Sequence, residues 1–141
     1  MESIDEQIFQ NLKEIAGRYI TLKKKVALKN GLSLSECNML CIVSASGPII
    51  QSRLGECCGI DKPATSRLVN KLISENLILK FHNADNKKNS FIKISHKGKI
   101  LIEKIQQEVN KEKDTFFKTL SLKDKEVALL LMEKVLAKNC E

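Results

Sequence analysis

The chain has 141 residues, of which 43% are hydrophobic and 29% charged, and it carries a formal net charge of +7 at pH 7. This length suits one domain, 1–141, with a modest core, and no Pro-, Gly- or Ser-rich linker or internal repeat divides it. No apolar run approaches the ~20 residues of a membrane span, and the acidic start (Glu2, Asp5, Glu6) is unlike a signal peptide. We therefore expect a cytoplasmic protein without a membrane partner.

Apolar residues at heptad-like spacing predict a long first helix from about Ile4 to Lys29. They are spaced 4, 3, 4, 3 and 4 residues apart and comprise Ile8, Leu12, Ile15, Tyr19, Leu22 and Val26. A seam of this kind needs a partner surface. We expect part of it to join the intramolecular core and the rest to pair with a second copy of the chain.

Two short helices separated by a tight turn are predicted next. Leu54 and Cys58 share one face of the first helix, Gly59 closes the turn, and Asp61 is the expected N-cap of the second. In the second helix Ala64, Leu68 and Leu72 repeat at i, i+4 and i+8, with Val69 beside them. Its other positions are suited to phosphates and base edges, and the predicted DNA contacts here are Lys62, Pro63, Thr65, Ser66, Arg67, Asn70 and Lys71.

A β-hairpin follows, with strands at residues 77–81 and 91–94. The polar segment between them, residues 82–89, predicts a loop too long for a two-residue turn. Lys87 and Lys88 are expected to project from it as a wing tip that reaches a phosphate or the minor groove. The alternative is a charged loop that only keeps the chain soluble.

The distribution of charge favours the DNA-binding interpretation. Residues 48–98 hold nine Lys and Arg side chains against four acids, which leaves +5 of the chain's +7, whereas each flank carries +1. The basic excess is therefore concentrated in the segment that has the two short helices and the hairpin.

Two further helices complete the pattern. Ser95 is the expected cap of the first, whose apolar positions are Ile100, Leu101, Ile105 and Val109. After a break at residues 120–122 the last helix begins at Ser121 or a neighbour, with Val127, Leu130, Leu131, Met132, Val135 and Leu136 as its apolar residues. We expect the segments at about 1–30 and 96–141 to form dimerisation helices, with Ile8, Leu12, Ile15, Tyr19, Val127, Leu131 and Val135 at the dimer contact.

This order predicts a mainly α fold with a small β-hairpin wing, a winged helix-turn-helix at about residues 33–98. Several segments also resemble the MarR family (multiple antibiotic resistance regulators) of bacterial transcription regulators. The resemblance rests on Gly59-Ile60-Asp61, Thr65-Ser66-Arg67-Leu68-Val69, Leu72, Ile94-Ser95 and Gly98. The family's wing typically reads Asp-Pro-x-Asp-Arg-Arg, where this chain has Asn83-Ala84-Asp85-Asn86-Lys87-Lys88. Lysine lacks the planar two-pronged contact of arginine, so we expect a weaker or less selective wing.

What the resemblance implies is a homodimer that places one recognition helix per subunit in successive major grooves of double-stranded DNA, with the wings at the minor groove. It also implies a ligand- or stress-responsive repressor, released by a phenolic or other anionic effector or by cysteine oxidation, and a pseudo-palindromic operator.

The five cysteines differ in how well their positions suit a redox sensor. Cys37 and Cys41 lie at i, i+4 on an expected second helix, and Cys57 follows in the third; any of these is a sensor if it is exposed and acidified. Cys58 takes an apolar position and is expected to pack, and Cys140 lies in the tail. A cytosol keeps such thiols reduced.

No cofactor, metal site or catalytic group is expected. His82 and His96 flank the wing without a Cys pair, and no phosphate-binding loop or nucleophile elbow occurs. The main expectation is thus a DNA-binding regulator and not an enzyme. The alternatives are a winged-helix protein-interaction module, separable by salt-dependent DNA binding, and a thiol redox sensor, separable by a Cys-free variant.

Overall fold

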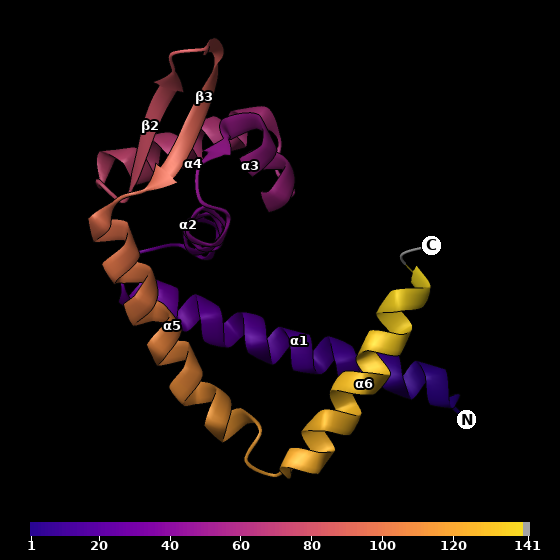
Figure 1. The fold of residues 1–141 in the computed structure, drawn as a ribbon. Coiled ribbons are helices and arrows are strands. Elements are labelled where there is room, and N and C mark those ends of the chain that lie inside the picture. The colour runs from indigo at the N-terminus through magenta and orange to yellow at the C-terminus, as the bar shows by residue number, and fades with distance from the viewer. Residues whose placement is uncertain (140–141) are drawn as a thin grey trace. The chain divides into compact units, whose positions relative to one another are not determined.

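A computed structural model describes residues 1–139, except for the side chains at 83, 86–88 and 138–139 (Figure 1). The elements are α1 (Ile4–Lys29), α2 (Leu34–Ser46), β1 (Ile49–Ile50), α3 (Gln51–Cys58), α4 (Lys62–Ser74), β2 (Ile78–Asn83), β3 (Asn86–Ile94), α5 (His96–Phe116) and α6 (Leu122–Asn139). The mainly α fold with a β-hairpin wing is confirmed. By its contacts the chain divides into two compact units, one up to Val109 and one from Asn110; a single domain over 1–141 stays a prediction.

The long first helix has the predicted bounds, and a capping box fixes its start. The Ser3 hydroxyl accepts a hydrogen bond from the Glu6 amide at 3.2 Å, and the Ser3 amide donates to Glu6 Oε2 at 2.9 Å. Both pairs satisfy amides that have no partner within the helix. At the other end, Asn30 and Lys29 both contact the Glu108 carboxylate on α5, each at 3.4 Å.

Helices α3 and α4 form the predicted helix-turn-helix. Gly59 ends α3 at φ 68°, a left-handed conformation that suits glycine. Asp61 then caps α4, since its Oδ1 accepts a hydrogen bond from the Ala64 amide at 2.8 Å. Pro63 lies in the first turn, where no intrahelical partner is needed for its missing amide.

The face of α4 that enters the core differs from the predicted one. Thr65, Val69 and Leu72 are buried, whereas Ala64 and Leu68 are only half-buried. Placing Thr65 on the exposed polar surface was wrong. Its side chain is 3% exposed and its hydroxyl donates to the Asp61 carbonyl at 2.7 Å, so the hydroxyl has a partner inside the protein.

Thr65 packs on Gly55 of α3, where an added Cβ would lie 2.3 Å from Thr65 Oγ1. The close approach of the two helices therefore needs a glycine on α3 and the small Thr65 on α4. This contact holds the exposed face of α4 at a fixed orientation to α3.

The sheet has three antiparallel strands in the order β1-β3-β2. The two-residue strand β1 was not anticipated; Ile49 pairs with Ile92 and Ile50 with Phe91. The predicted long wing loop was wrong, because the strands continue until only Ala84 and Asp85 separate them. The regular register ends at His82 opposite Ser90, and the irregularity between His82 and Asn83 accommodates the unequal strand lengths.

The core of the first unit is built around α2. Its Cys37, Met39, Leu40 and Val43 are fully buried, and they cluster with residues of α3, α4 and the sheet, namely Leu54, Val69, Leu72, Ile78 and Ile92. Figure 1 shows α2 end-on, next to α3, α4 and the hairpin. Burial of these apolar groups is the main force that fixes the helix-turn-helix to the wing.

Helix α5 begins where the hairpin ends, as predicted. Ser95 Oγ accepts a hydrogen bond from the Gly98 amide at 2.9 Å and donates to the Asn76 carbonyl at 2.6 Å. Gly98 is packed so closely that an added Cβ would lie 2.1 Å from the Leu77 carbonyl oxygen. The start of α5 is thus tied to the connection between α4 and β2.

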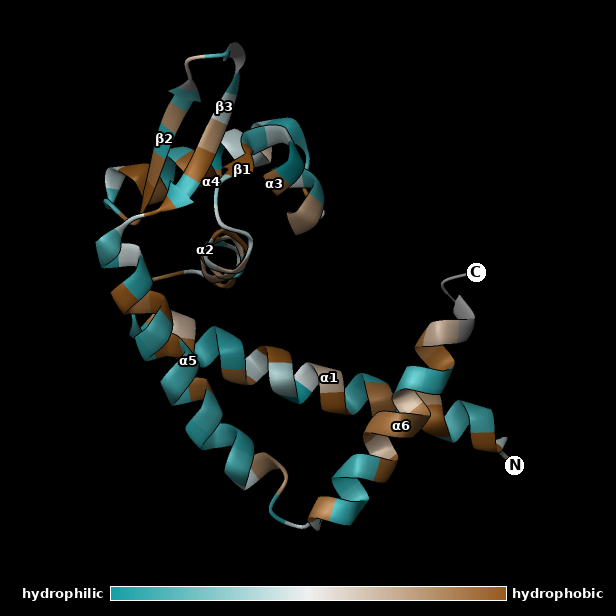
Figure 2. Ribbon diagram, viewed as in Figure 1, coloured by the Kyte–Doolittle hydropathy of each residue, from teal (hydrophilic) through white to brown (hydrophobic). Residues whose placement is uncertain are grey.

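The second unit holds the end of α5 and helix α6. Ser121 starts α6 as predicted: its hydroxyl accepts from the Asp124 amide at 3.1 Å, and Asp124 Oδ2 accepts from the Ser121 amide at 3.0 Å. The apolar side chains of α6 are exposed, among them Val127, Leu131 and Val135. Figure 2 shows that hydrophobic and hydrophilic residues alternate along this helix. No helix in the described part of the chain is long and apolar enough to span a membrane.

Candidate nucleic-acid interface

The exposed face of α4 carries most of the predicted recognition residues. Lys62, Pro63, Arg67, Asn70 and Lys71 are exposed and Ser66 is half-buried. Since Thr65, Val69 and Leu72 anchor the opposite face in the core, these side chains are presented outward on a fixed helix. The helix-turn-helix therefore positions donors and cations on one surface, which is what contact with phosphates and base edges requires.

The cations of this face are not equivalent. Lys71 Nζ lies 3.3 Å from Glu75 Oε1, one helical turn away, so its charge already has a partner. Arg67 is in no ion pair with any residue that the structure describes. Ser66 Oγ accepts a weak hydrogen bond from Gln51 Nε2 at 3.4 Å. Arg67, like Lys62 at the start of the helix, is thus an exposed cation without an ion pair among the described residues.

A hollow of about 500 Å³ lies beside α4 and joins it to the wing. Lys62 of α4, Lys80 of β2 and Gln51 of α3 line it, together with Asn89 and Ser90 of β3. Apart from Lys62, these residues were not predicted as contacts. A signal for Lys80 exists in the sequence, because it is the one charged residue in the apolar run 77–81.

At the wing tip, Lys87 and Lys88 lie in β3, immediately after the Ala84-Asp85 turn. Their side chains are outside the described part of the structure, so their contact with DNA stays a prediction. On the outer face of the hairpin, Phe81 stacks on Phe91 with ring centroids 5.7 Å apart, and Lys93 Nζ lies 5.2 Å from the Phe81 centroid. These contacts stiffen the strands that carry the tip.

The candidate redox cysteines have three different environments. Cys37 is fully buried, Cys41 is half-buried and Cys57 is exposed at the end of α3. The hydrogen bond from Cys37, together with the charge of Lys23, lowers the pKa of Cys41 to about 7 against the opposing effect of burial. The same hydrogen bond and burial raise the pKa of Cys37. Cys41 thus combines partial exposure with a lowered pKa.

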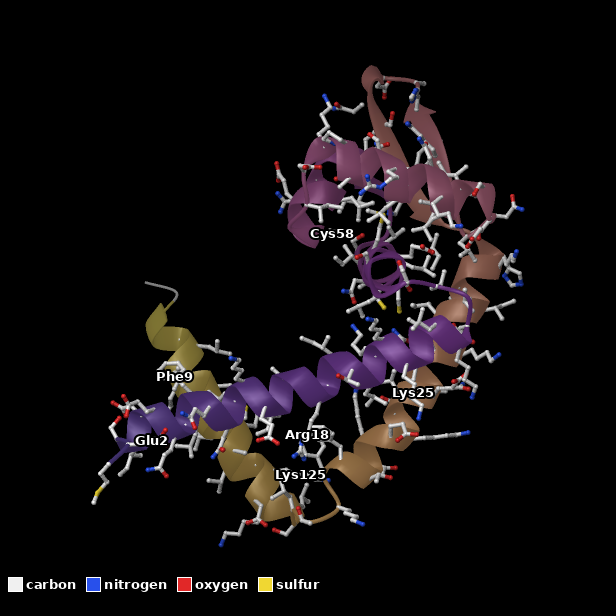
Figure 3. The ribbon with its side chains drawn as sticks, turned by 180° about the vertical axis from the view of Figure 1, so that it is seen from behind. Glu2, Phe9, Arg18, Lys25, Cys58 and Lys125 are labelled. Atoms are coloured by element: carbon white, nitrogen blue, oxygen red, sulfur yellow. The ribbon has the colours of Figure 1, made fainter. Side chains whose placement is uncertain are left out.

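Cys58, labelled in Figure 3, ends α3 next to the turn. It is half-buried and packs against the core, as expected for a cysteine in an apolar position. Burial, followed by the charge of Cys57, raises the pKa of the Cys58 thiol. Cys140 lies outside the described residues. Within residues 1–139, no three His, Cys, Asp or Glu side chains are grouped in a way that suits a metal ion.

Comparison with protein families and solved structures identifies the class to which this arrangement belongs. The model of the MarR family matches residues 32–90, the segment from the start of α2 to the wing. Comparison with curated proteins gave no match.

Solved structures match almost the whole chain. Apo wild-type MarR from E. coli is 17% identical with a TM-score of 0.80, covering 96% of this chain and 98% of that one. A mutant E. coli MarR complexed with operator DNA is 17% identical with a TM-score of 0.76, covering 96% and 99%. A probable transcriptional regulator from Pseudomonas aeruginosa is 22% identical with a TM-score of 0.72, covering 94% and 99%. The MarR family model thus matches the winged helix-turn-helix segment, and the fold of the chain is similar to that of these solved MarR-type structures.

Proposed function

We propose that the protein is a transcriptional regulator that binds a pseudo-palindromic DNA site as a homodimer, with α4 in the major groove and the wing near the minor groove. The observation that carries the proposal is the exposed face of α4. It presents Arg67 without an ion pair among the described residues, and it lies within the segment that holds +5 of the chain's +7.

Further support comes from the hollow beside α4. Lys62 of α4 and Lys80 of β2 both line it, so a cation of the helix and a cation of the wing border the same surface. A duplex that contacts α4 would meet both at its phosphates. The solved complex of a mutant E. coli MarR with operator DNA shows that this fold is compatible with DNA binding.

We propose repression as the output, with release by a small phenolic or other anionic effector. This part rests on the family alone.

The test is a selection of bound duplexes from a random-sequence pool, followed by fluorescence anisotropy on the selected site at several salt concentrations. We expect an inverted repeat, an affinity that falls steeply with salt, and at least ~10³-fold weaker binding to unrelated duplex. Failure to enrich any sequence, with no salt-dependent binding, would contradict the proposal and favour the alternative of a protein-interaction module whose basic face meets an acidic protein.

A further inference from the structure

The segment that follows α4 is hydrogen-bonded to the start of α5. Each of three successive carbonyls after α4 accepts a hydrogen bond from Ser95 or Lys97. The donors are Lys97 Nζ to the Glu75 carbonyl at 3.0 Å, Ser95 Oγ to that of Asn76 at 2.6 Å, and the Ser95 amide to that of Leu77 at 3.0 Å. The end of the recognition helix is therefore joined to α5 by a row of bonds.

The Ser95 hydroxyl serves both helices. Besides donating to the Asn76 carbonyl, it accepts a hydrogen bond from the Gly98 amide, in the first turn of α5, at 2.9 Å. Asn76 itself ends α4 in the left-handed conformation at φ 60°, and its amide donates to the Ile73 carbonyl at 2.9 Å. Helix ends leave backbone groups without partners inside the helix, and here one side chain supplies a partner to each end.

These bonds add a direction that apolar packing lacks. Helix α5 also buries Ile102, Ile105 and Val109 in the core, but apolar contact is non-directional. Hydrogen bonds weaken steeply when they are bent, so three of them in a row limit the rotation of α4 about the start of α5. From this point α5 continues as one helix to Phe116, into the segment that we propose for dimerisation.

The orientation of α4 relative to α5 matters for a dimer that binds an inverted repeat. The two recognition helices then have to match half-sites ~34–36 Å apart, one turn of DNA. One added base pair moves the half-sites ~3.4 Å further apart and rotates one by ~34° about the DNA axis. A joint that lets α4 rotate would tolerate this change, whereas a rigid joint would not.

We propose that Ser95 and Lys97 are positioning residues that hold the recognition helix to α5 and thereby set the half-site spacing that the protein accepts. They act through α4 and need no contact with DNA. The inference rests on the proposed function, and it adds which residues determine the spacing.

Three replacements separate the two bonds of the Ser95 hydroxyl. Ser95→Asp keeps an acceptor for the Gly98 amide but has no proton for the Asn76 carbonyl, whereas Ser95→Thr keeps both bonds and Ser95→Ala keeps neither. Fluorescence anisotropy compares the selected inverted repeat with duplexes that have one base pair added or removed between the half-sites. We expect the wild type and Ser95→Thr to prefer the selected spacing at least ~10-fold, and Ser95→Asp and Ser95→Ala to reduce that preference at least ~3-fold.

The role of Lys97 has a matched control in Lys99, an exposed cation of α5 that is in no ion pair among the described residues. Lys97→Met keeps the apolar stem but removes the donor to the Glu75 carbonyl, and Lys99→Met removes the same charge without that bond. We expect Lys97→Met to reduce the spacing preference at least ~2-fold and Lys99→Met to leave it unchanged.

A duplex with a single half-site gives a readout that a merely structural role would not leave unchanged. Its affinity for Ser95→Asp should lie within ~2-fold of the wild type, because α4 keeps the side chains that contact DNA. For the same reason Lys97→Met and Lys99→Met should bind it equally. Circular dichroism establishes that each variant is folded.

Three results would overturn the inference while the proposed function stands. They are a Ser95→Asp protein with the spacing preference of the wild type, an equal preference in the Lys97→Met and Lys99→Met proteins, and a fall in half-site affinity as large as the fall in spacing preference. A wild-type protein without sequence-specific binding would instead contradict the proposed function, and this inference with it.

Discussion

Arg67 and Ser66 are neighbours on α4, but their surroundings differ. Arg67 is exposed and is in no ion pair within the described part of the chain, whereas Ser66 is half-buried and bonded to Gln51 of α3. A guanidinium with this freedom can make a bidentate contact with guanine. Ser66, by contrast, is already engaged within the protein, so we expect the two residues to contribute unequally.

We predict that Arg67→Ala weakens specific DNA binding by about 1–3 kcal/mol and flattens the sequence preference at one position of each half-site. Ser66→Ala should cost less. Anisotropy titrations on the selected site and its single-base variants measure both effects. The matched control is Lys111→Ala, which removes a cation from an exposed position on α5. Unchanged affinity in the Arg67→Ala protein would remove α4 from the reading role.

Among the glycines, Gly98 has the least space for an added side chain. An alanine Cβ there would lie 2.1 Å from the Leu77 carbonyl oxygen, and a backbone atom cannot move aside as a flexible side chain can. We predict that Gly98→Ala lowers the free energy of unfolding by about 1–3 kcal/mol.

Gly17 provides the control for this prediction. It lies inside α1 on the face opposite the seam of Ile8 to Val26, with nothing within 4 Å of an added Cβ. Gly17→Ala should raise the free energy of unfolding by about 0.5–1 kcal/mol, because alanine favours the helix. Urea unfolding of both variants measures the difference, and equal effects would show that the crowding at Gly98 has no energetic consequence.

At the scale of elements, the wing and α4 are placed by different forces. The wing is a hairpin whose strands pair regularly up to His82 and Ser90, and β1 adds a third strand through Ile49 and Ile50. Helix α4 is held by Thr65 against Gly55 and by Val69 and Leu72 in the core. The wing tip therefore projects from a hairpin that a third strand supports. A projecting tip suits a contact that depends on charge more than on precise geometry.

We predict that replacing both Lys87 and Lys88 with Ala weakens binding to all duplexes and flattens the dependence of log K on log salt by about 0.9 for each phosphate that the protein no longer neutralises. Sequence preference should change little, because phosphates carry no base information. The control is the double replacement of Lys111 and Lys113 on α5. A salt slope equal to that of the wild type would mean that the two wing lysines are only solvated charges.

At the scale of the whole molecule, the apolar residues that the core leaves exposed point to self-association. On α1, Ile8, Leu12, Ile15 and Tyr19 are 42–52% exposed, whereas Val26 at the end of the same seam is 5% exposed. On α6, Val127, Leu131 and Val135 are 49–61% exposed. Only the last part of the α1 seam is thus buried by residues of its own unit, and a second copy is the surface that we propose for the rest.

We predict a homodimer at micromolar concentration without DNA, and a monomer or a less stable protein when Leu131 and Val135 are both replaced by Glu, since burying two carboxylates is unfavourable. Sedimentation velocity measures the state of both proteins. In the dimer two copies of α4 should lie about 34–36 Å apart, so half-sites should be about 10 bp between centres. A monomeric wild type would contradict both expectations.

Much of the element order could be predicted because its signals are local. Ser3, Asp61, Ser95 and Ser121 each bond to an amide three residues along the chain, and Gly59 adopts the left-handed turn conformation itself. These interactions need no distant partner, so the helix starts can be found from the sequence. The excess of positive charge between residues 48 and 98 is equally a property of the sequence.

Contacts between distant segments were decided by the tertiary structure alone. Periodicity favoured Ala64 for the buried face of α4, but the close approach of Gly55 selects Thr65, one residue further on. Strand β1 forms only because it pairs with Ile92 and Phe91 of β3, and Lys23 bonds to Asn38 only because α1 packs on α2. Pairings of this kind depend on which surfaces bury the most apolar area together, and that is determined by the packing of the whole core rather than by any one segment.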